Sequence, residues 1–206
     1  MKLDCIVIQF ARFPKLGGVK TRLHPELGKE GCLPFYLELV RHVHDQVKQS
    51  GLFHVIALDD TGTDPLMNEL MKTTPMILQY GNDLGERMHN AIAWGLTKAN
   101  KVIVIGSDCV VLNQAHLKAV VNELEDHSHV FIPAEDGGYV LVAATQSYGD
   151  IFTNIEWGTD VVMEKTKAAI MAGNKKAAYL PLLWDVDRPE DYRRLLEQFP
   201  NWPNLN

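Results

Sequence analysis

Residues Lys101–Leu112 read KVIVIGSDCVVL, and this stretch predicts the centre of the fold. Its four consecutive aliphatic residues, Val102–Ile105, favour a strand that is buried on both faces, as in the middle of a parallel sheet. The strand is expected to stop at Gly106, and Asp108 follows directly. Open α/β sheets bind ligands beyond the carboxyl ends of their strands. Asp108 is therefore a candidate functional residue, although turn and helix N-cap positions also favour aspartate.

Strand and helix patterns alternate along the rest of the chain. Strand patterns cover Leu3–Phe10, Phe53–Leu58, Met76–Tyr80, Val130–Pro133, Lys176–Leu180 and, after a turn, the end of Glu135–Ala144. Helical spacing covers Leu33–Gln49, Pro65–Met71, Leu84–Ala99, Asn113–Glu125, Val161–Met171 and a last helix that begins near Pro189. The alternation predicts an α/β fold with three layers and a mostly parallel sheet. No repeat or linker interrupts it, so residues 1–206 are expected to form a single domain.

Composition narrows the class of protein. The 206 residues are 46% hydrophobic and 22% charged, which suits an ordinary globular core. A formal net charge of −6 disfavours a general nucleic-acid binder, and no apolar run is long enough for a membrane span. The three cysteines lack C-x-x-C spacing, and Asp4 interrupts any signal-peptide core. We therefore expect buried free thiols and a soluble, cytoplasmic protein.

A basic loop follows the first predicted strand. It reads ARFPKLGGVKTRLH over 11–24, with two adjacent glycines and the four cations Arg12, Lys15, Lys20 and Arg22. Glycines let a backbone approach a ligand closely, and clustered cations neutralise phosphates. The loop matches neither the G-x-G-x-x-G nor the Walker A fingerprint. It predicts a phosphate-binding segment of another kind, with an ordinary solvated loop as the alternative.

Two carboxylates distant in sequence are candidates for a metal site. Asp108 and Asp187 could together hold a hard divalent cation, because magnesium needs only one or two protein carboxylates when phosphate oxygens supply the rest. Asp185, Glu190 and Asp191 compete for the second position. Acids are also common in the first turn of a helix, which is the simpler interpretation of Glu190 and Asp191.

The segment PAEDGGYVLV, Pro133–Val142, places two acids before two glycines. Glu135 or Asp136 could bind acceptor hydroxyls or serve as a general base. The Asp-Gly pair is equally typical of a hairpin turn, and the residues alone favour that interpretation.

Six motifs in one order resemble a known family. They are KTRL (Lys20–Leu23), GNDLGERM (Gly81–Met88), VIGSDC (Val104–Cys109), PAEDGGYVLV, IEWGTDVV (Ile155–Val162) and DVDRPEDY (Asp185–Tyr192). Together they resemble small bacterial glycosyltransferases of the GT-A fold associated with radical-SAM and selenodomain proteins. Some of these are described as arsenosugar-biosynthesis glycosyltransferases. The family belongs to the nucleotide-diphospho-sugar transferase superfamily, and the resemblance covers almost the whole chain. It also extends to the molybdenum-cofactor and phospholactate guanylyltransferases.

The resemblance implies a role for each matching residue. Asp108 and Asp187 would bind Mg²⁺ or Mn²⁺, and Asp108 would act in catalysis together with Glu135 and Asp136. The nucleotide and its phosphates would contact Lys20, Arg22, Asp83, Glu86 and Arg87. The basic loop itself adds Arg12 and Lys15 as candidate phosphate ligands. The acceptor would contact Glu135, Asp136, Gly137, Gly138, Trp157 and Thr159.

Two departures from the family pattern stand beside these matches. Val110 replaces the proline that relatives usually carry after the Asp-Cys pair, and no D-x-D triplet surrounds Asp108.

These observations predict a metal-dependent transferase with nucleotide-linked substrates. The expected reaction moves a sugar from a nucleotide-sugar to a small-molecule acceptor. The alternative is nucleotidyl transfer from a nucleoside triphosphate with release of pyrophosphate. A third hypothesis is a nucleotide-binding module without catalysis, against which the presence of Lys20, Arg22, Asp108 and Asp187 argues. The base, the sugar, the acceptor and the oligomeric state are left open.

Overall fold

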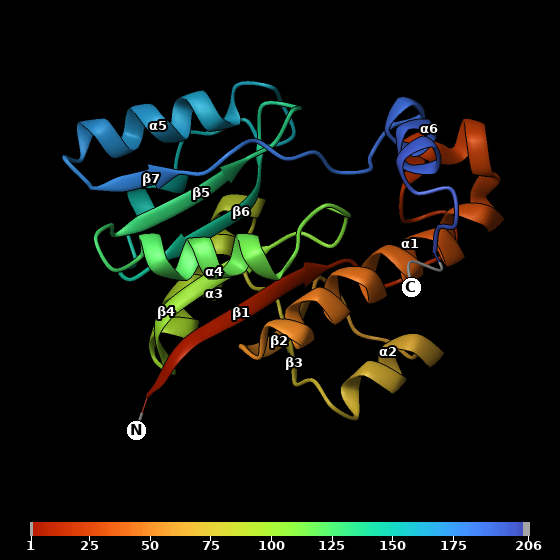
Figure 1. The fold of residues 1–206 in the computed structure, drawn as a ribbon, viewed down its shortest axis with the longest axis horizontal. Coiled ribbons are helices and arrows are strands. Elements are labelled where there is room, and N and C mark those ends of the chain that lie inside the picture. Colours follow the sequence, from red (N-terminus) through yellow and green to blue (C-terminus); the bar gives the residue numbers. More distant parts are fainter. Residues whose placement is uncertain (1, 204–206) are drawn as a thin grey trace.

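The computed structural model describes residues 2–203 as a seven-stranded sheet with helices on both faces (Figure 1). The strand order is β3-β2-β1-β4-β6-β5-β7. The strands are β1 Leu3–Ala11, β2 Phe53–Leu58, β3 Met76–Leu78, β4 Ala99–Ile105, β5 His129–Pro133, β6 Tyr139–Ala144 and β7 Ala177–Tyr179. The helices are α1 His24–Ser50, α2 Pro65–Met71, α3 Leu84–Leu96, α4 Gln114–Glu123, α5 Val162–Ala172 and α6 Pro189–Gln198, with short 3₁₀ turns η1 Thr21–Leu23 and η2 Gly149–Phe152.

The predicted fold class is confirmed. Strand β6 runs antiparallel to both of its neighbours, β4 and β5, and the other neighbouring strands pair in parallel. The antiparallel strand follows from the predicted Asp-Gly turn, because a short hairpin can join only antiparallel strands. The hairpin closes with a hydrogen bond from the Ala134 amide to the Gly138 carbonyl, 3.0 Å long.

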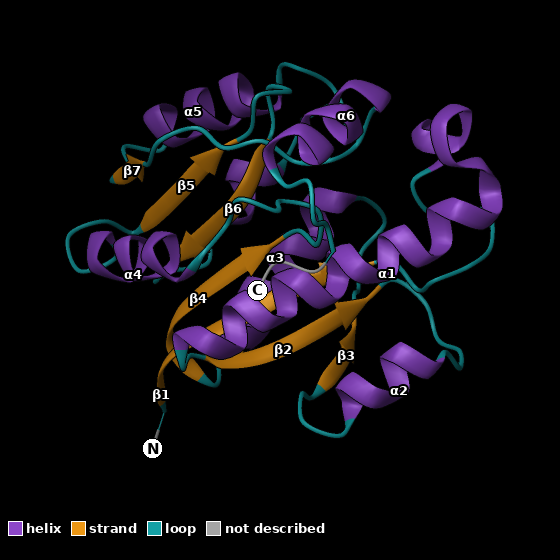
Figure 2. Ribbon diagram, turned by 45° about the vertical axis from the view of Figure 1, so that its right-hand side comes forward, coloured by secondary structure: helices purple, strands orange, loops and turns teal. Residues whose placement is uncertain are grey.

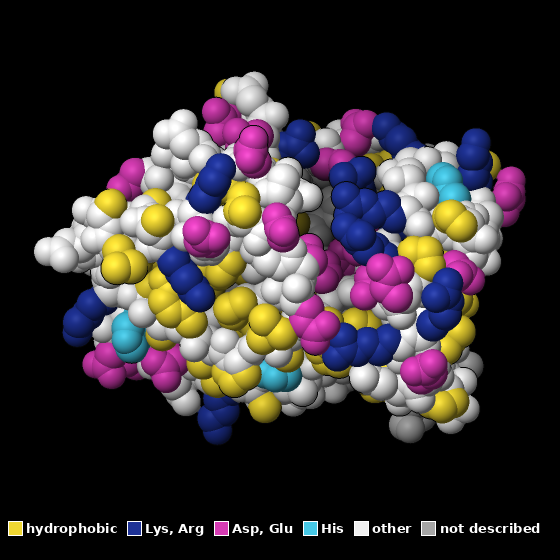
Figure 3. Space-filling view, turned by 90° about the horizontal axis from the view of Figure 1, so that it is seen from above, with side chains coloured by type: hydrophobic (Ala, Val, Ile, Leu, Met, Phe, Trp, Pro, Cys, Tyr) yellow, Lys and Arg dark blue, Asp and Glu magenta, His cyan; other side chains and the backbone are white. Residues whose placement is uncertain are grey.

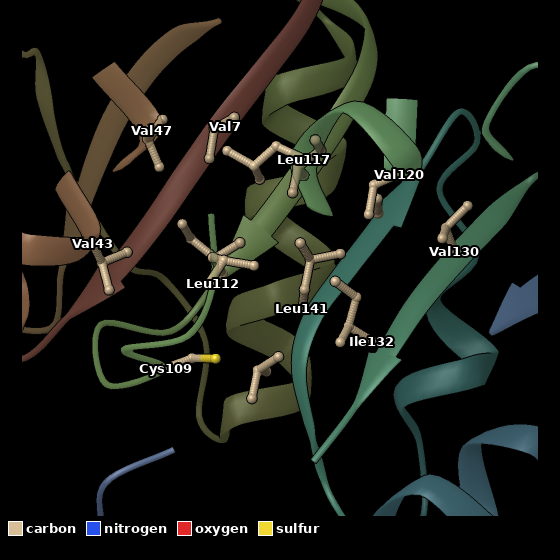
Figure 4. Packing of buried hydrophobic residues seen from close by; sticks show 14 of the residues in the cluster. Val7, Val43, Val47, Cys109, Leu112, Leu117, Val120, Val130, Ile132 and Leu141 are labelled. Atoms are coloured by element: carbon tan, nitrogen blue, oxygen red, sulfur yellow. The ribbon is translucent and has the colours of Figure 1, made fainter. Parts of the chain in front are cut away.

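The aliphatic run of β4 is buried on both faces, as its sequence predicts. Ile103 and Ile105 belong to one apolar cluster, whereas Val102 and Val104 belong to another on the opposite face. On the first face, side chains of α1 and α4 such as Val43 and Leu117 pack onto the sheet (Figure 4). Truncating a buried aliphatic side chain of this kind to alanine typically costs about 2–5 kcal/mol. The centre of the sheet is therefore a rigid support for the loops at its edge.

Local signals explain some of the helix ends. The Asp83 carboxylate accepts a hydrogen bond from the Glu86 amide, 2.8 Å long, and so caps α3. Gly51, in the left-handed region at φ 74°, ends α1. The start of α1 differs from the prediction, because it lies at His24 instead of Leu33. The helix bends at Gly28, where φ is 65° and ψ is 172°, and this interruption hides its first turns from a periodicity search.

The carboxyl ends of β2, β4 and β5 point toward the same side of the molecule, where α6 lies (Figure 2). Helix α6 packs through Leu195 with Leu23 of η1 and with Phe35 of α1. This apolar contact joins the end of the chain to the basic loop that follows β1. Within residues 2–203, no helix is long and apolar enough to cross a membrane. The cysteines Cys5, Cys32 and Cys109 are buried free thiols, as predicted.

Candidate functional site

The turn after β4 is fastened to β1 by buried polar side chains. The Gln9 side-chain amide donates to the Ser107 hydroxyl at 3.0 Å and to the Val40 carbonyl at 3.1 Å. The Ser107 hydroxyl in turn donates to the Phe10 carbonyl at 2.7 Å. These bonds hold the Gly-Ser-Asp turn at the edge of the sheet and fix the position of Asp108.

Lys20 connects Asp108 to the last loop of the chain. Its ammonium donates to the Asp108 carboxylate at 2.9 Å and to the Val186 carbonyl at 2.6 Å. The same nitrogen lies 3.8 Å from a carboxylate oxygen of Asp187. The Arg22 guanidinium binds the other oxygen of Asp187 at 2.5 Å. The structure therefore brings four of the predicted site residues into one ion-pair network.

Burial and charge act in opposite directions on Lys20. Its side chain is only 6% exposed, and this desolvation lowers the pKa of the ammonium. The field of Asp108, the hydrogen bond to it and the fields of Asp187 and Asp185 outweigh the burial, so the pKa of Lys20 is raised. Lys20 is therefore a charged ammonium held between carboxylates at neutral pH.

Asp185 lies in the same field as these carboxylates. Burial, followed by the negative charges of Asp108 and Asp136, raises the pKa of Asp185 to about 7, and Lys20 partly offsets that shift. A carboxyl group whose pKa is raised this far is a candidate functional group, although ion-pair networks also shift pKa values.

The donor set around Lys20 fits a hard divalent cation. Asp108 and Asp187 supply carboxylate oxygens, which are the ligands that Mg²⁺ and Mn²⁺ prefer. A positive charge already lies between them in the form of the Lys20 ammonium. Within the described residues, no group of three or more His, Cys, Asp or Glu side chains forms a metal cage. A divalent cation held by Asp108 and Asp187 would need further oxygen ligands, which phosphate groups can supply.

A cavity of about 590 Å³ opens beside this network at the ends of β1 and β4. Arg12, Lys20, Arg22 and Arg87 line it, together with Asp59, Asp108 and Asp187. The four cations come from the basic loop and the first turns of α3. We call this space the basic cavity, and its lining suits the phosphates of a nucleotide.

A second cavity of about 510 Å³ adjoins the first, and both are lined by Arg22, Gly158 and Asp187. Among the described residues that line it, seven are acidic and two are basic. The acids are Glu135, Asp136, Asp160, Asp185, Asp187, Glu190 and Asp191, and the cations are Arg22 and Arg188. We call it the acidic cavity. Figure 3 shows basic and acidic side chains close together around a hollow in one face of the molecule.

The two acids of the hairpin are bound differently. Arg194 of α6 holds Glu135 through two hydrogen bonds of 2.7 and 3.1 Å, and these bonds lower the pKa of the Glu135 carboxyl. Asp136 accepts a hydrogen bond of 2.9 Å from the Gly138 amide through one oxygen. Asp136 is therefore the hairpin acid that is better able to accept a further hydrogen bond.

Gly137 and Trp157 have packing roles in the structure. Gly137 lies at φ 89°, and a Cβ there would come within 2.0 Å of the Asp160 carbonyl oxygen. The Trp157 ring packs edge-on against Tyr139 and covers Gly85 of α3. The hairpin and the 157–161 segment are thus in direct backbone contact. Thr159 lines the acidic cavity, and its hydroxyl donates to the Glu156 carbonyl at 2.7 Å.

Two residues predicted for nucleotide binding have other partners in the structure. Lys15 pairs with Asp60 at 2.5 Å on the exposed side of the loop. Asp83 caps α3, and Arg87 from the same helix lines the basic cavity. The roles assigned to all of these residues stay predictions.

Sequence reasoning missed residues that support the site. Tyr36 of α1 accepts a hydrogen bond from the Arg12 amide and donates one to the Arg12 carbonyl, at 2.6 and 2.9 Å. Gln9 could have been noticed as a polar residue in an apolar strand. Arg194 had no such signal, because its partner Glu135 lies far away along the chain.

The fold and part of the sequence match known proteins. A proposed nucleotide-diphospho-sugar transferase from Desulfovibrio desulfuricans G20 has a solved structure that is 25% identical in sequence. It aligns with a TM-score of 0.87 over 98% of this chain and 90% of that one. The 4-diphosphocytidyl-2C-methyl-D-erythritol synthase of Anaerococcus prevotii DSM 20548 aligns with a TM-score of 0.62 and 12% identity, over 96% of this chain and 99% of that one. At that identity the likeness concerns the fold.

A curated enzyme and a family model match in sequence. The 2-phospho-L-lactate guanylyltransferase of Methanobrevibacter ruminantium is 23% identical over 134 residues. The match covers 60% of this chain and 57% of that enzyme's length. The model of the family DUF2064, described as "Uncharacterized protein conserved in bacteria", matches residues 42–159, which include the Asp108 turn and the hairpin. The chain belongs to this family, and its fold is that of the nucleotide-diphospho-sugar transferases and nucleotidyltransferases.

Proposed function

We propose that this chain is a metal-dependent glycosyltransferase that uses a nucleotide-sugar as donor and a small uncharged acceptor. The contrast in charge between the two adjoining cavities carries this proposal. One cavity is rich in cations and suits a diphosphate, whereas the other is rich in carboxylates. The sugar would cross from one to the other at their common border, which Arg22, Gly158 and Asp187 form.

The basic cavity supports the donor half of the proposal. Arg12, Arg22 and Arg87 can bind phosphate oxygens, and arginine does so through two parallel hydrogen bonds. Asp108 and Asp187 would hold Mg²⁺ or Mn²⁺, which would neutralise the charge on the departing diphosphate. Fixed charges of this kind stabilise a transition state because they need no reorganisation during the reaction.

The acidic cavity supports the acceptor half. An acceptor phosphate would meet like charges there, and one unpaired carboxylate at 4 Å repels a unit negative charge by about 4 kcal/mol in a partly screened environment. A hydroxyl acceptor can instead donate hydrogen bonds to the same carboxylates. We assign the proton-accepting role to Asp136, since Arg194 already holds Glu135.

Nucleotidyl transfer is the second candidate function. The match to a guanylyltransferase and the fold shared with a 4-diphosphocytidyl-2C-methyl-D-erythritol synthase favour it. The four cations of the basic cavity would also suit a triphosphate. The two reactions differ in their small product, which is a nucleoside diphosphate in one case and pyrophosphate in the other. The association with radical-SAM and arsenosugar proteins stays a prediction of the resemblance.

The test is a product assay with purified protein. Nucleotide-sugars and nucleoside triphosphates are each incubated with Mg²⁺ or Mn²⁺ and with a panel of free sugars, amines and sugar phosphates. We expect release of nucleoside diphosphate with an uncharged acceptor. Release of pyrophosphate with a phosphorylated acceptor would show that the protein catalyses nucleotidyl transfer instead of glycosyl transfer. Thermal stabilisation by nucleotide without any product would favour the non-catalytic module.

A further inference from the structure

Lys20 occupies the space where the two predicted metal ligands converge. Its ammonium contacts Asp108 at 2.9 Å and approaches Asp187 to 3.8 Å, so both carboxylates face the same positive charge. The Val186 carbonyl, between Asp185 and Asp187 in sequence, accepts a third contact at 2.6 Å. Two carboxylates and a carbonyl around one cation are the oxygen ligands that a hard metal ion takes.

The loop around Lys20 is shaped to place the ammonium there. Lys20 lies in the left-handed backbone region at φ 47° and ψ 42°, which residues other than glycine adopt only where their surroundings impose it. The next residues form η1, whose Leu23 is completely buried against α1 and α6. The Cys32 thiol contacts the Lys20 carbonyl at 3.4 Å. The position of Lys20 is thus built into the fold, unlike that of the exposed Lys15 in the same loop.

We propose that Lys20 fills the cation position of the site in the nucleotide-free protein and leaves it when a divalent metal arrives with the nucleotide. The released ammonium then binds the phosphates in the basic cavity, which Lys20 also lines. This inference rests on the proposed function, since it assigns the metal and the nucleotide to the same site. It implies that free metal binds weakly, because the metal must displace an ammonium from both carboxylates.

The first test measures Mn²⁺ alone, without nucleotide, by the loss of the free-ion electron paramagnetic resonance signal. Lys20→Met should bind Mn²⁺ at least tenfold more tightly than the unchanged protein. Lys15→Met is the matched control, because it removes the same charge from the same loop at a side chain that is 58% exposed. Its Mn²⁺ affinity should stay within twofold of that of the unchanged protein. Adding Asp108→Asn to Lys20→Met should abolish the gain.

Equal Mn²⁺ affinity in the unchanged protein and in a folded Lys20→Met variant would overturn the proposal. A gain of the same size in Lys15→Met would also overturn it, since the effect would then be one of overall charge. Circular dichroism checks that each variant is folded.

A second test uses the unchanged protein and does not depend on how Lys20→Met folds. Lysine side chains are amidinated briefly, and the extent of labelling at Lys20 is read by mass spectrometry of its peptide. Lys20 should be protected in potassium chloride, and saturating Mn²⁺ at the same ionic strength should raise its labelling at least fivefold. Lys15 should label equally in both conditions. The same extent of labelling at Lys20 with and without Mn²⁺ would overturn the proposal.

Neither measurement follows sugar or nucleotidyl transfer. A negative result here would therefore leave the choice between the two reactions to the product assay, and a negative product assay would leave these binding results interpretable.

Discussion

Gly137 offers a sharp test of how the hairpin is held beside the acidic cavity. In Gly137→Ala, the new Cβ would lie 2.0 Å from the Asp160 carbonyl oxygen and 2.5 Å from its carbon. These are backbone atoms, so no side-chain rotation can relieve the overlap. Glycine is also needed for the backbone, because φ is 89°. A left-handed alanine costs about 1 kcal/mol, and overpacking typically adds about 2 kcal/mol. We expect a loss of about 3 kcal/mol in the free energy of unfolding.

Gly158→Ala is the matched control for this prediction. Gly158 has a similar φ of 82°, but its Cβ would meet nothing within 4 Å. The control should therefore lose only the backbone cost of about 1 kcal/mol. In thermal unfolding of a chain this size, the expected falls in Tm are roughly 6–12 °C for Gly137→Ala and roughly 2–4 °C for Gly158→Ala. Equal losses in the two variants would refute the argument that the contact with Asp160 fixes the hairpin.

Three further changes test the charges of the site. Asp108→Asn should lower turnover at least 100-fold while circular dichroism shows an intact fold, because one of the carboxylates expected to hold the metal loses its charge. Arg87→Ala should weaken nucleotide binding in calorimetry about tenfold. Lys15→Ala should raise the Kd less than Arg87→Ala does, since Lys15 pairs with Asp60 and does not line the basic cavity. The pKa of Asp185 is raised to about 7 in the folded protein, which therefore binds this proton more tightly than the unfolded chain does. Ionisation of Asp185 consequently lowers the free energy of unfolding as the pH rises from about 4 to 7. Asp185→Asn should accordingly raise Tm at pH 8 and change it little at pH 4, and the opposite order would contradict the assigned shift.

The elements that could be predicted are those whose cause is local. An apolar run without alternation identifies β4, and the Asp-Gly pair identifies the hairpin that makes β6 antiparallel. No local signal placed β6 between β4 and β5. Strands β5 and β6 are apolar on both faces, so their residues do not show which of them lies next to β4. Periodicity also failed at the start of α1, where a glycine bend interrupts the helix.

For the candidate site, residue type was predictable and partners were not. The basic loop and the acids of DVDRPEDY are visible as charges in the sequence, and the fold brings both to the same edge of the sheet. The sequence suggested that Lys20 and Arg22 bind phosphates, whereas in the structure each contacts a predicted metal ligand. Lys20 and Asp108 lie more than 80 residues apart in the sequence, and no local pattern predicts a contact between such distant residues.

Lys20 can contact the predicted metal ligands in the empty site and still bind phosphates in the loaded one, and the pairing of charges explains why. A buried ammonium is costly without counter-charges, and a pair of adjacent carboxylates repels without a cation. Lys20 and the Asp108–Asp187 pair therefore stabilise each other while the site holds neither metal nor nucleotide. A metal–nucleotide complex would bring one cation for the carboxylates and several anionic oxygens for the lysine. The exchange would leave every charge paired before and after binding, so one lysine can serve the empty site and the loaded one.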